Sequence, residues 1–373
     1  MSRYRARQKA RPWRTHHSIN LHTHNVKPLI LLALLFILAA CASPKQTSFA
    51  LQKTEIEAER TRHYTQAFTY QLKQRARLAE VAQPLLESSI HDCPSNTRYS
   101  LGIFLHSLQS YTEQERPAAE QLYQLNETPK ILYVLNNGAA NPQLKTGDQL
   151  LKVNDQQAPK NITKLQRLIA ESIKKGDPVS FLIQRNNEPR TVTITPHKIC
   201  AYPILYSNSD TINGYADGHK IIITAGLMRV AKQDPQLALI IAHELAHNTL
   251  HHINQRLTNT ALGGLIDIAL ISSGVISPFI GAGLGANLYT QAYEIEADLE
   301  GLRLMHQAGF EIEGLDQFWQ TMASIHPSTI SQGIEMSHPT TVERALLIRK
   351  KIVELKQKKL RHHNHTKLLS PNY

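Results

Sequence analysis

The chain has 373 residues, a length that has room for two or three domains. Of these residues, 42% are hydrophobic and 19% charged, a balance that excludes a mainly disordered protein. Its formal net charge of +11 is typical of nucleic-acid binding, but residues 1–40 hold seven Lys or Arg without an acid, and residues 344–373 hold nine with one acid. The body, 41–343, has 25 basic and 29 acidic residues, a net charge of −4, so we expect no nucleic-acid partner.

The N-terminal segment has the pattern of an export signal. After the basic residues, twelve apolar residues run unbroken over 29–40, which suits a signal-peptide core and is too short for a membrane-spanning helix. The run ends in Leu-Ala-Ala before Cys41, which resembles the lipobox of bacterial lipoproteins. This resemblance implies a signal peptide at 1–40, lipidation of Cys41, and a chain anchored in the bacterial envelope, at the outer membrane facing the periplasm. An ordinary signal peptide with an incidental cysteine is the alternative.

The next segment, 41–90, is predicted to be a polar tether followed by a helix. From about Thr54 to Ile90 the apolar residues recur at helical spacing, as at Tyr64, Phe68 and Leu72. Pro84 is a position at which this helix can kink or end. The apolar stripe predicts that the helix packs against the body of the protein.

Residues 91–200 alternate strand and helix patterns. Strands are predicted at 131–135, 179–183 and 191–195, a helix at 163–173, and a hairpin turn at Asn186-Asn187. This order resembles a PDZ domain, and 138–150 resembles the G-x-x-A-x-x-A-G-L-x-x-G-D-x-I segment of that family, except at Pro142-Gln143. The resemblance implies a domain over 91–200 that can bind an extended peptide at a sheet edge, with residues 100–103 as the carboxylate-binding loop.

The cysteine count fits an oxidising compartment. Besides Cys41, the chain has only Cys93 and Cys200. If Cys41 is lipidated, this even pair predicts one disulfide bond, and two buried free thiols are the alternative. No Cys-x-x-Cys spacing occurs, so a zinc site built from cysteines has no support.

A pair of histidines indicates a metal site in residues 201–373. Asp234 is the predicted N-cap of a helix, with Pro235 in its first turn. This helix contains Ile-Ile-Ala-His-Glu-Leu-Ala-His at 240–247. His243 and His247 are four residues apart, so they share one helix face and can bind one metal ion, with Glu244 beside it. This is the HExxH pattern of two zinc ligands and a general base. The apolar neighbours predict a buried helix, in which histidines without partners would be costly.

A catalytic zinc ion needs a third protein ligand. Glu294 and Asp298 are four residues apart on a second predicted helix, and Glu296 points to another face. HELAH, followed about fifty residues later by E-x-x-A-D, resembles the HtpX- and BepA-type zinc metallopeptidases, relatives of the CAAX prenyl proteases. The resemblance implies that Glu294 is the third ligand and that Asp298 orients a ligand histidine.

Two more segments extend this resemblance over about 201–350. One resembles the family's N-A-F-A…G-x-I-x-V stretch, which implies an edge strand that pairs with substrate, and in this chain Gly214 replaces the usual alanine. Its residues are Asn213, Ile221, Ile222 and Ile223. The other resembles the H-P-x-x-x-x-x-R element, which places His338 at the zinc cleft, as an oxyanion donor or as a latch on the metal, and Arg344 in the outer shell of the site.

Residues 262–286 are apolar over a length that could span a bilayer. They include Asp267, Pro278 and six glycines. HtpX-like relatives have membrane helices at this place, whereas BepA-like relatives have packed helices near the cleft. Because a lipid anchor is already expected, we predict a buried or lid-like helical hairpin, with a membrane-embedded segment as the alternative.

The sequence thus predicts an α+β protein. A β-rich PDZ-like domain precedes a mainly helical zinc-peptidase domain with a small sheet, at 201–373, which ends in a basic tail. The expected function is that of a metalloendopeptidase with one Zn²⁺ per chain, acting on periplasmic or outer-membrane proteins in protein quality control. The alternative is a non-proteolytic PDZ scaffold or chaperone with a structural or closed zinc site, although a structural site needs no general base at Glu244.

Overall fold

The structure is a computed structural model that describes residues 51–252, 255, 280–325 and 342–368. The chain divides into two compact units, 1–56 and 57–373, and the account below concerns the second. The predicted signal peptide, Cys41, His338 and most of the apolar segment 262–286 lie outside the described residues. No helix among the described residues is long and apolar enough to cross a membrane.

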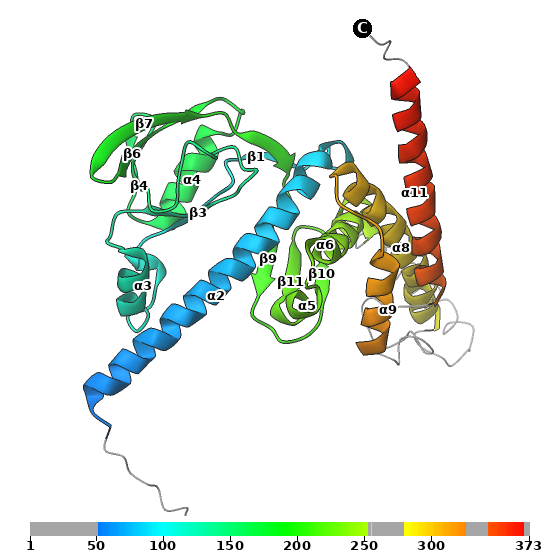
Figure 1. The fold of residues 1–373 in the computed structure, drawn as a ribbon, viewed down its shortest axis with the longest axis horizontal. Coiled ribbons are helices and arrows are strands. Elements are labelled where there is room, and N and C mark those ends of the chain that lie inside the picture. Colours follow the sequence, from blue (N-terminus) through cyan, green and yellow to red (C-terminus); the bar gives the residue numbers. More distant parts are fainter. Residues whose placement is uncertain (1–50, 253–254, 256–279, 326–341, 369–373) are drawn as a thin grey trace, which may run out of the picture. The chain divides into compact units, whose positions relative to one another are not determined.

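Helix α2 (Lys53–Ser88) is the long helix that the sequence predicts, and it continues through Pro84 (Figure 1). Its C-terminal half is buried in the core of the helical part of the chain, through residues such as Leu78, Val81 and Leu85. Its N-terminal half contacts a separate aromatic cluster, in which Phe68 packs 5.1 Å from Tyr111, measured between ring centroids. The predicted apolar stripe therefore packs on two different cores.

The β-rich part is built around a six-stranded antiparallel sheet with the order β2-β3-β4-β6-β7, in which β5 pairs with β4. Its elements are η1 (Ile90–Asp92), β1 (Thr97–Ser100), β2 (Ile103–His106), η2 (Leu108–Ser110), α3 (Arg116–Tyr123), β3 (Lys130–Val134), β4 (Gln149–Val153), β5 (Gln156–Gln157), α4 (Ile162–Ser172), β6 (Val179–Arg185), β7 (Glu188–Ile194) and β8 (His197–Cys200). The predicted hairpin joins β6 to β7, and Asn186 and Asn187 have φ of 52° and 65°. Positive φ at both positions is what a type I′ turn requires.

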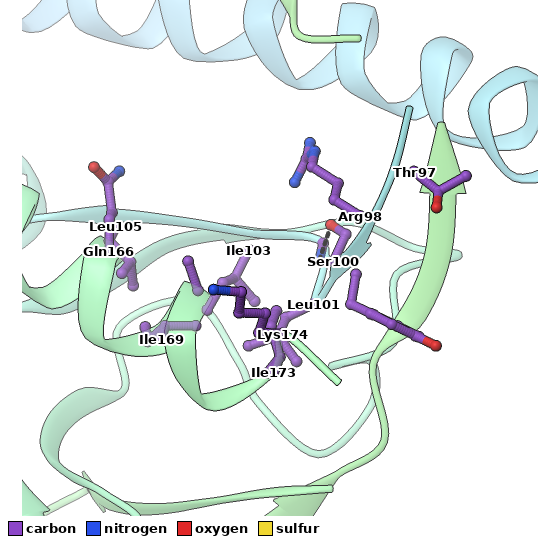
Figure 2. Close-up of a pocket in the computed structure, with 13 residues that line it drawn as sticks. Thr97, Arg98, Ser100, Leu101, Ile103, Leu105, Gln166, Ile169, Ile173 and Lys174 are labelled. Atoms are coloured by element: carbon purple, nitrogen blue, oxygen red, sulfur yellow. Dashed lines mark hydrogen bonds between the residues drawn. The ribbon is translucent and has the colours of Figure 1, made fainter. Parts of the chain in front are cut away.

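Strand β2 lies at the edge of this sheet, with helix α4 beside it. Buried residues of α4, of the segment before β2 and of the other strands form one apolar core, which includes Leu101, Leu165 and Phe181. Ile103 and Leu105 of β2 are partly buried and pack against this core. A groove of about 320 Å³ runs between β2 and α4 (Figure 2). The position of the groove follows from the topology, because β2 has a sheet neighbour on one side only.

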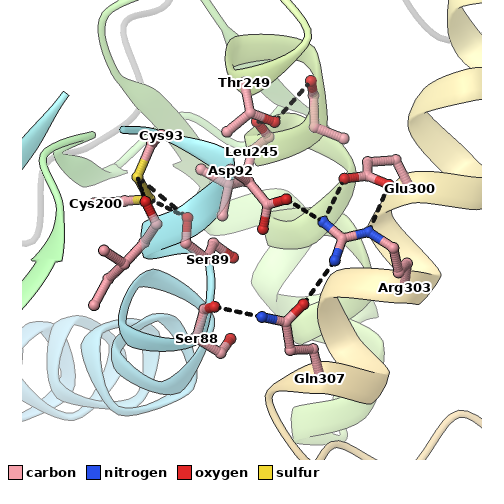
Figure 3. A network of polar contacts seen from close by, with 12 residues as sticks. Ser88, Ser89, Asp92, Cys93, Cys200, Leu245, Thr249, Glu300, Arg303 and Gln307 are labelled. Atoms are coloured by element: carbon pink, nitrogen blue, oxygen red, sulfur yellow. Dashed lines mark hydrogen bonds and ion pairs between the residues drawn. A yellow bond between two sulfur atoms is a disulfide. The ribbon is translucent and has the colours of Figure 1, made fainter. Parts of the chain in front are cut away.

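A disulfide bond joins the two ends of the β-rich part. Strand β1 pairs antiparallel with β8, and Cys93 is bonded to Cys200, with Cα atoms 5.9 Å apart, where the chain enters and leaves this part. Next to the disulfide, Arg303 Nη2 of helix α8 lies 2.5 Å from Asp92 Oδ1, and the Gln307 amide donates to a carbonyl at the end of α2 (Figure 3). These contacts attach one end of α8 to the disulfide segment.

The helical part contains a three-stranded sheet with the order β10-β11-β9. Its elements are β9 (Ile204–Ser207), β10 (Gly214–Ala216), β11 (Ile221–Thr224), α5 (Ala225–Val230), α6 (Asp234–Thr249), α8 (Ile280–Gln307), α9 (Leu315–Ile325) and α11 (Val342–Leu368). β11 pairs antiparallel with β10 and parallel with β9, so its backbone is bonded on both sides. The prediction that Ile221, Ile222 and Ile223 form the substrate edge is therefore wrong, and among the described strands β10 is the edge nearest to helix α6.

Helices α6 and α8 cross closely in the centre of the helical part (Figure 1). Gly301 of α8 lies at the crossing, where an added Cβ would come within 3.0 Å of the backbone nitrogen of His243. The backbones of the two predicted metal-ligand helices are therefore in close contact at this glycine. In the chain as a whole, a β-rich domain precedes this mainly helical part. This is the α+β class that the sequence predicts.

Candidate metal centre

Helix α6 carries the HExxH residues in its buried interior. The helix begins at Asp234, with Gln233 rather than Asp234 as its N-cap. His243 and His247 have 2% and 6% of their surface exposed, and their Nε2 atoms lie 3.1 Å apart. The four-residue spacing therefore brings both imidazoles to one point on the side of the helix.

Helix α8 brings Glu294 to the same point. Glu294 Oε2 lies 3.4 Å from His243 Nε2, and Glu294 Oε1 lies 3.3 Å from His247 Nε2. Zinc bonds of about 2.0–2.2 Å in tetrahedral geometry require ligand atoms to be about 3.3 Å apart. The three buried ligand atoms are thus spaced as a zinc ion needs, and all lie within 4.8 Å of one another.

Asp298 and Arg344 surround these ligands. Asp298 Oδ1 lies 3.0 Å from His243 Nδ1, the ring nitrogen that does not face Glu294. Arg344 Nε and Nη2 donate to the Asp298 carboxylate at 2.7 and 2.8 Å, and Arg344 Nη1 lies 3.0 Å from Glu294 Oε2. The guanidinium also lies 4.9 Å from the ring centre of Trp319. Arg344 therefore fixes two carboxylates that contact His243.

The buried charges of this cluster match a divalent cation. Around the ligand histidines, the described residues include three buried carboxylates, those of Glu244, Glu294 and Asp298, and one buried guanidinium, that of Arg344. Their formal sum is −2, which Zn²⁺ would neutralise. In the protein without metal, burial lowers the pKa of His243, but Asp298 and Glu294 outweigh this effect and raise that pKa to about 10. A proton on His243 and a bound metal ion would thus compensate the same excess of negative charge.

Glu244 directly follows the ligand His243 in the chain, and its side chain lies next to strand β10. Its side chain is 2% exposed, and an added Cβ on Gly214 would lie 3.5 Å from Glu244 Oε1. The same Cβ would come within 2.9 Å of Ile240, so glycine allows β10 to approach α6 closely. Asn213 precedes β10, and its amide bonds to the Thr224 hydroxyl at 3.1 Å. The carboxylate and the edge strand are therefore neighbours.

Sequence reasoning missed two residues of this region. His252 Nδ1 lies 3.0 Å from His247 Nδ1, and Trp319 lies 6.1 Å from His243 between ring centroids. Neither belongs to a spacing pattern, although His252 stands in a histidine-rich stretch that follows HELAH. Glu296 does lie apart from the ligand cluster, as predicted, with its side chain 57% exposed. Nothing can be added for His338, which lies outside the described residues.

The groove of the β-rich part is a second candidate site. Figure 2 shows Ile169, Ile173 and Lys174 opposite the strand segment that carries Leu101 and Ile103. The predicted carboxylate-binding loop, 100–103, thus lines one wall of the groove. Within this loop Gly102 has φ of +71°, and its amide donates to the Ser100 hydroxyl at 3.2 Å.

The fold and the ligand cluster together define a class. Two histidines of an HExxH helix and a glutamate of a following helix converge on one point, and the HExxH glutamate lies next to a sheet edge. This arrangement is that of zinc metallopeptidases.

Comparison with known sequences specifies the domains. Residues 193–352 match Peptidase family M48, and residues 101–195 match the PDZ domain family. Each match covers part of the chain, and together they indicate a PDZ domain followed by a domain similar to the M48 peptidases, whose members are zinc-dependent enzymes. The resemblance of these two segments to the PDZ and zinc-metallopeptidase families is confirmed.

Curated relatives align over part of their length. The beta-barrel assembly-enhancing protease of Yersinia pestis is 28% identical over 131 residues, which cover 31% of this chain and 27% of that protein. The mitochondrial metalloendopeptidase OMA1 of Schizosaccharomyces pombe is 31% identical over 130 residues, 30% of this chain and 38% of that protein. A solved structure, the HtrA-type protease AlgW with decapeptide, covers 27% of this chain and 30% of its own, with 22% identity and a TM-score of 0.22, too low to support a conclusion.

Proposed function

We propose that this protein is a zinc metalloendopeptidase that cleaves proteins of the bacterial cell envelope. The observation that carries the proposal is the convergence of His243, His247 and Glu294 beside Glu244. Zinc, when bound by such ligands, acidifies a water molecule and polarises the scissile carbonyl. A structural zinc site needs no buried carboxylate next to its ligands, so Glu244 supports proteolysis over a scaffold or chaperone role.

Glu244 is the general base in this proposal. It receives the proton of the attacking water and returns it to the leaving amine, which restores the carboxylate after each cycle. The Asp298 carboxylate, 3.0 Å from His243 Nδ1, favours a proton on that nitrogen and so the tautomer that offers Nε2 to the metal. Arg344 in turn holds Asp298 and Glu294 in place.

Strand β10 is the segment to which we assign substrate binding. An extended peptide can add to a sheet edge by backbone hydrogen bonds, and β10 is the described edge next to Glu244. Backbone recognition does not read side chains, so we expect loose sequence selectivity. The Tyr215 side chain, 38% exposed on this strand, is available to contact a bound peptide.

The PDZ groove is proposed to bind a peptide of the same or another protein. Its floor is apolar at Leu101, Ile103 and Ile169, and Arg98 and Lys174 bring positive charge to its lining. This combination favours an apolar residue followed by a free carboxylate. Fluorescence anisotropy with a labelled peptide should show binding that is lost when the C-terminus is amidated, and equal binding of both forms would contradict the assignment.

The envelope location rests on the sequence and on the relatives. The bacterial relatives are named for β-barrel assembly, which fits an enzyme of protein quality control in the envelope. The lipobox-like segment before Cys41 supports a lipid anchor at the outer membrane. A disulfide between Cys93 and Cys200 also fits an oxidising compartment.

The substrate class can be tested in cells. Envelope proteins from cells with the wild-type chain or with Glu244→Gln are compared by sequencing of their N-termini. New N-termini present only with the wild type would support proteolysis and identify substrates. Identical sets of termini under conditions of envelope stress would contradict the proposal.

A further inference from the structure

His252 gives one ligand histidine an outer partner that the HExxH pattern does not foresee. It stands five residues after His247 and is buried, with 2% of its surface exposed. Its Nδ1 lies 3.0 Å from His247 Nδ1, and the two rings meet edge to face with centroids 5.0 Å apart. The contact is therefore made through the ring nitrogen of His247 that does not face the ligand cluster.

A reversal of the chain at the end of α6 brings His252 to this position. The helix ends at Thr249, and the Leu250 amide bonds back to the carbonyl of Ala246. His251 then has a left-handed conformation, with φ of +59°. A left-handed residue after a helix turns the chain away from the helix axis, so His252 can return toward His247.

The proton positions follow if His247 binds metal. His247 Nε2 lies 3.1 Å from His243 Nε2 and 3.3 Å from Glu294 Oε1, so it is the nitrogen that faces the cluster. A neutral imidazole that ligates through Nε2 carries its proton on Nδ1. His247 therefore donates from Nδ1 to His252 Nδ1, and His252 carries its own proton on Nε2.

Two neighbours orient the His252 ring. Tyr293 stacks on it, with centroids 4.6 Å apart and an interplanar angle of 23°. Glu296 Oε2 lies 3.3 Å from His252 Nε2, at ion-pair distance but without hydrogen-bond alignment. Because the Glu296 side chain is 57% exposed, it has room to rotate into alignment. The arrangement parallels the contact of Asp298 with the other ligand histidine.

We propose that His252 is a positioning residue of the zinc site. This proposal rests on the proposed function. It accepts the hydrogen bond of His247 Nδ1 and holds that ring in the tautomer that presents Nε2 to zinc, while Tyr293 and Glu296 fix its own orientation. Outer partners of metal-bound histidines typically contribute about 10–100-fold to metal affinity. His252 itself touches neither the metal nor the substrate.

Zinc affinity of the purified full chain, measured by competition with a chromophoric chelator, tests this role. His252→Asn keeps an acceptor oxygen near the place of Nδ1 but loses the ring. His252→Phe keeps the burial and the stacking on Tyr293 but has no acceptor. We expect His252→Phe to weaken zinc binding by about 10–100-fold and His252→Asn to bind more tightly than His252→Phe. The control is His251→Asn, an exposed neighbour whose left-handed conformation asparagine tolerates, with expected wild-type affinity.

The outcomes separate this inference from the proposed function. Wild-type affinity in His252→Phe, or tighter binding by His252→Phe than by His252→Asn, would reduce His252 to a packing residue and overturn the inference alone. A wild-type chain that binds no zinc would overturn both. If His252→Phe does not fold, ¹⁵N NMR of the zinc-loaded wild type gives the answer: a proton on His252 Nε2 is expected, and a proton on His252 Nδ1 would exclude the acceptor role.

Discussion

Removing the positive charge of Arg344 should destabilise the peptidase domain strongly. The guanidinium is 2% exposed and makes three contacts of 2.7–3.0 Å with Asp298 and Glu294. Arg344→Met keeps an unbranched apolar stem but leaves both buried carboxylates without this cation. Breaking a buried ion pair in this way costs about 3–5 kcal/mol, so we expect the free energy of unfolding of the metal-free protein to fall by about that amount.

Urea unfolding in the presence of a chelator, followed by tryptophan fluorescence, measures this loss. The chain has two tryptophans, Trp13 within the predicted signal peptide and Trp319, which lies against Arg344 and reports on the peptidase domain of the processed protein. The control is Arg349→Met on the same helix, where a 54% exposed arginine pairs with Asp316 at 3.0 Å and should contribute less than about 1 kcal/mol. If Arg344→Met loses no more stability than this control, the buried ion pairs do not hold the site together.

Three more predictions concern the surrounding fold. Replacing Cys93 and Cys200 by serine should lower the free energy of unfolding by about 4–5 kcal/mol in the chain-entropy account, because the bond spans 107 residues; alkylation of both thiols in denatured, unreduced protein would disprove the bond. Burial lowers the pKa of His106 to about 4, so as the pH falls the unfolded chain takes up a proton on this residue before the folded chain does. The free energy of unfolding should therefore decrease by up to about 3 kcal/mol between pH 6.5 and pH 4. Equal urea midpoint shifts between pH 7 and 5 in the wild type and His106→Gln would contradict this. Gly301→Val should cost about 1–3 kcal/mol and weaken zinc binding, because a side chain there meets the backbone of His243, and unchanged zinc affinity would show that the crossing tolerates it.

The ligand residues could be predicted from the sequence because helical spacing is local. Residues four apart share a helix face whatever the tertiary structure, so His243 could be paired with His247, and Glu294 with Asp298. The PDZ domain could be predicted from the order of short strands and one helix, and its hairpin from Asn186-Asn187. The convergence of the two helices on one point depends on tertiary packing and cannot be read from local spacing. That part of the prediction came from the family resemblance alone.

The errors have physical reasons as well. A run of isoleucines at 221–223 identifies a strand but not its neighbours, and only the pairing on both sides shows that it is central. An uninterrupted apolar run is in fact more typical of a strand covered on both faces. His252 was not predicted because a helix continued past Thr249 would carry it away from His247, and the left-handed turn at His251 that brings it back has no clear sequence signal.

Cleavage of an unfolded protein by the purified chain tests the central claim most directly. Wild type and Glu244→Gln are loaded with zinc, their zinc content is measured, and both are incubated with denatured casein, with and without a chelator. The account predicts chelator-sensitive cleavage by the wild type and a loss of at least about 10²-fold in Glu244→Gln at equal zinc content. Equal cleavage by both proteins would remove Glu244 from the chemistry and contradict a metallopeptidase mechanism at this site.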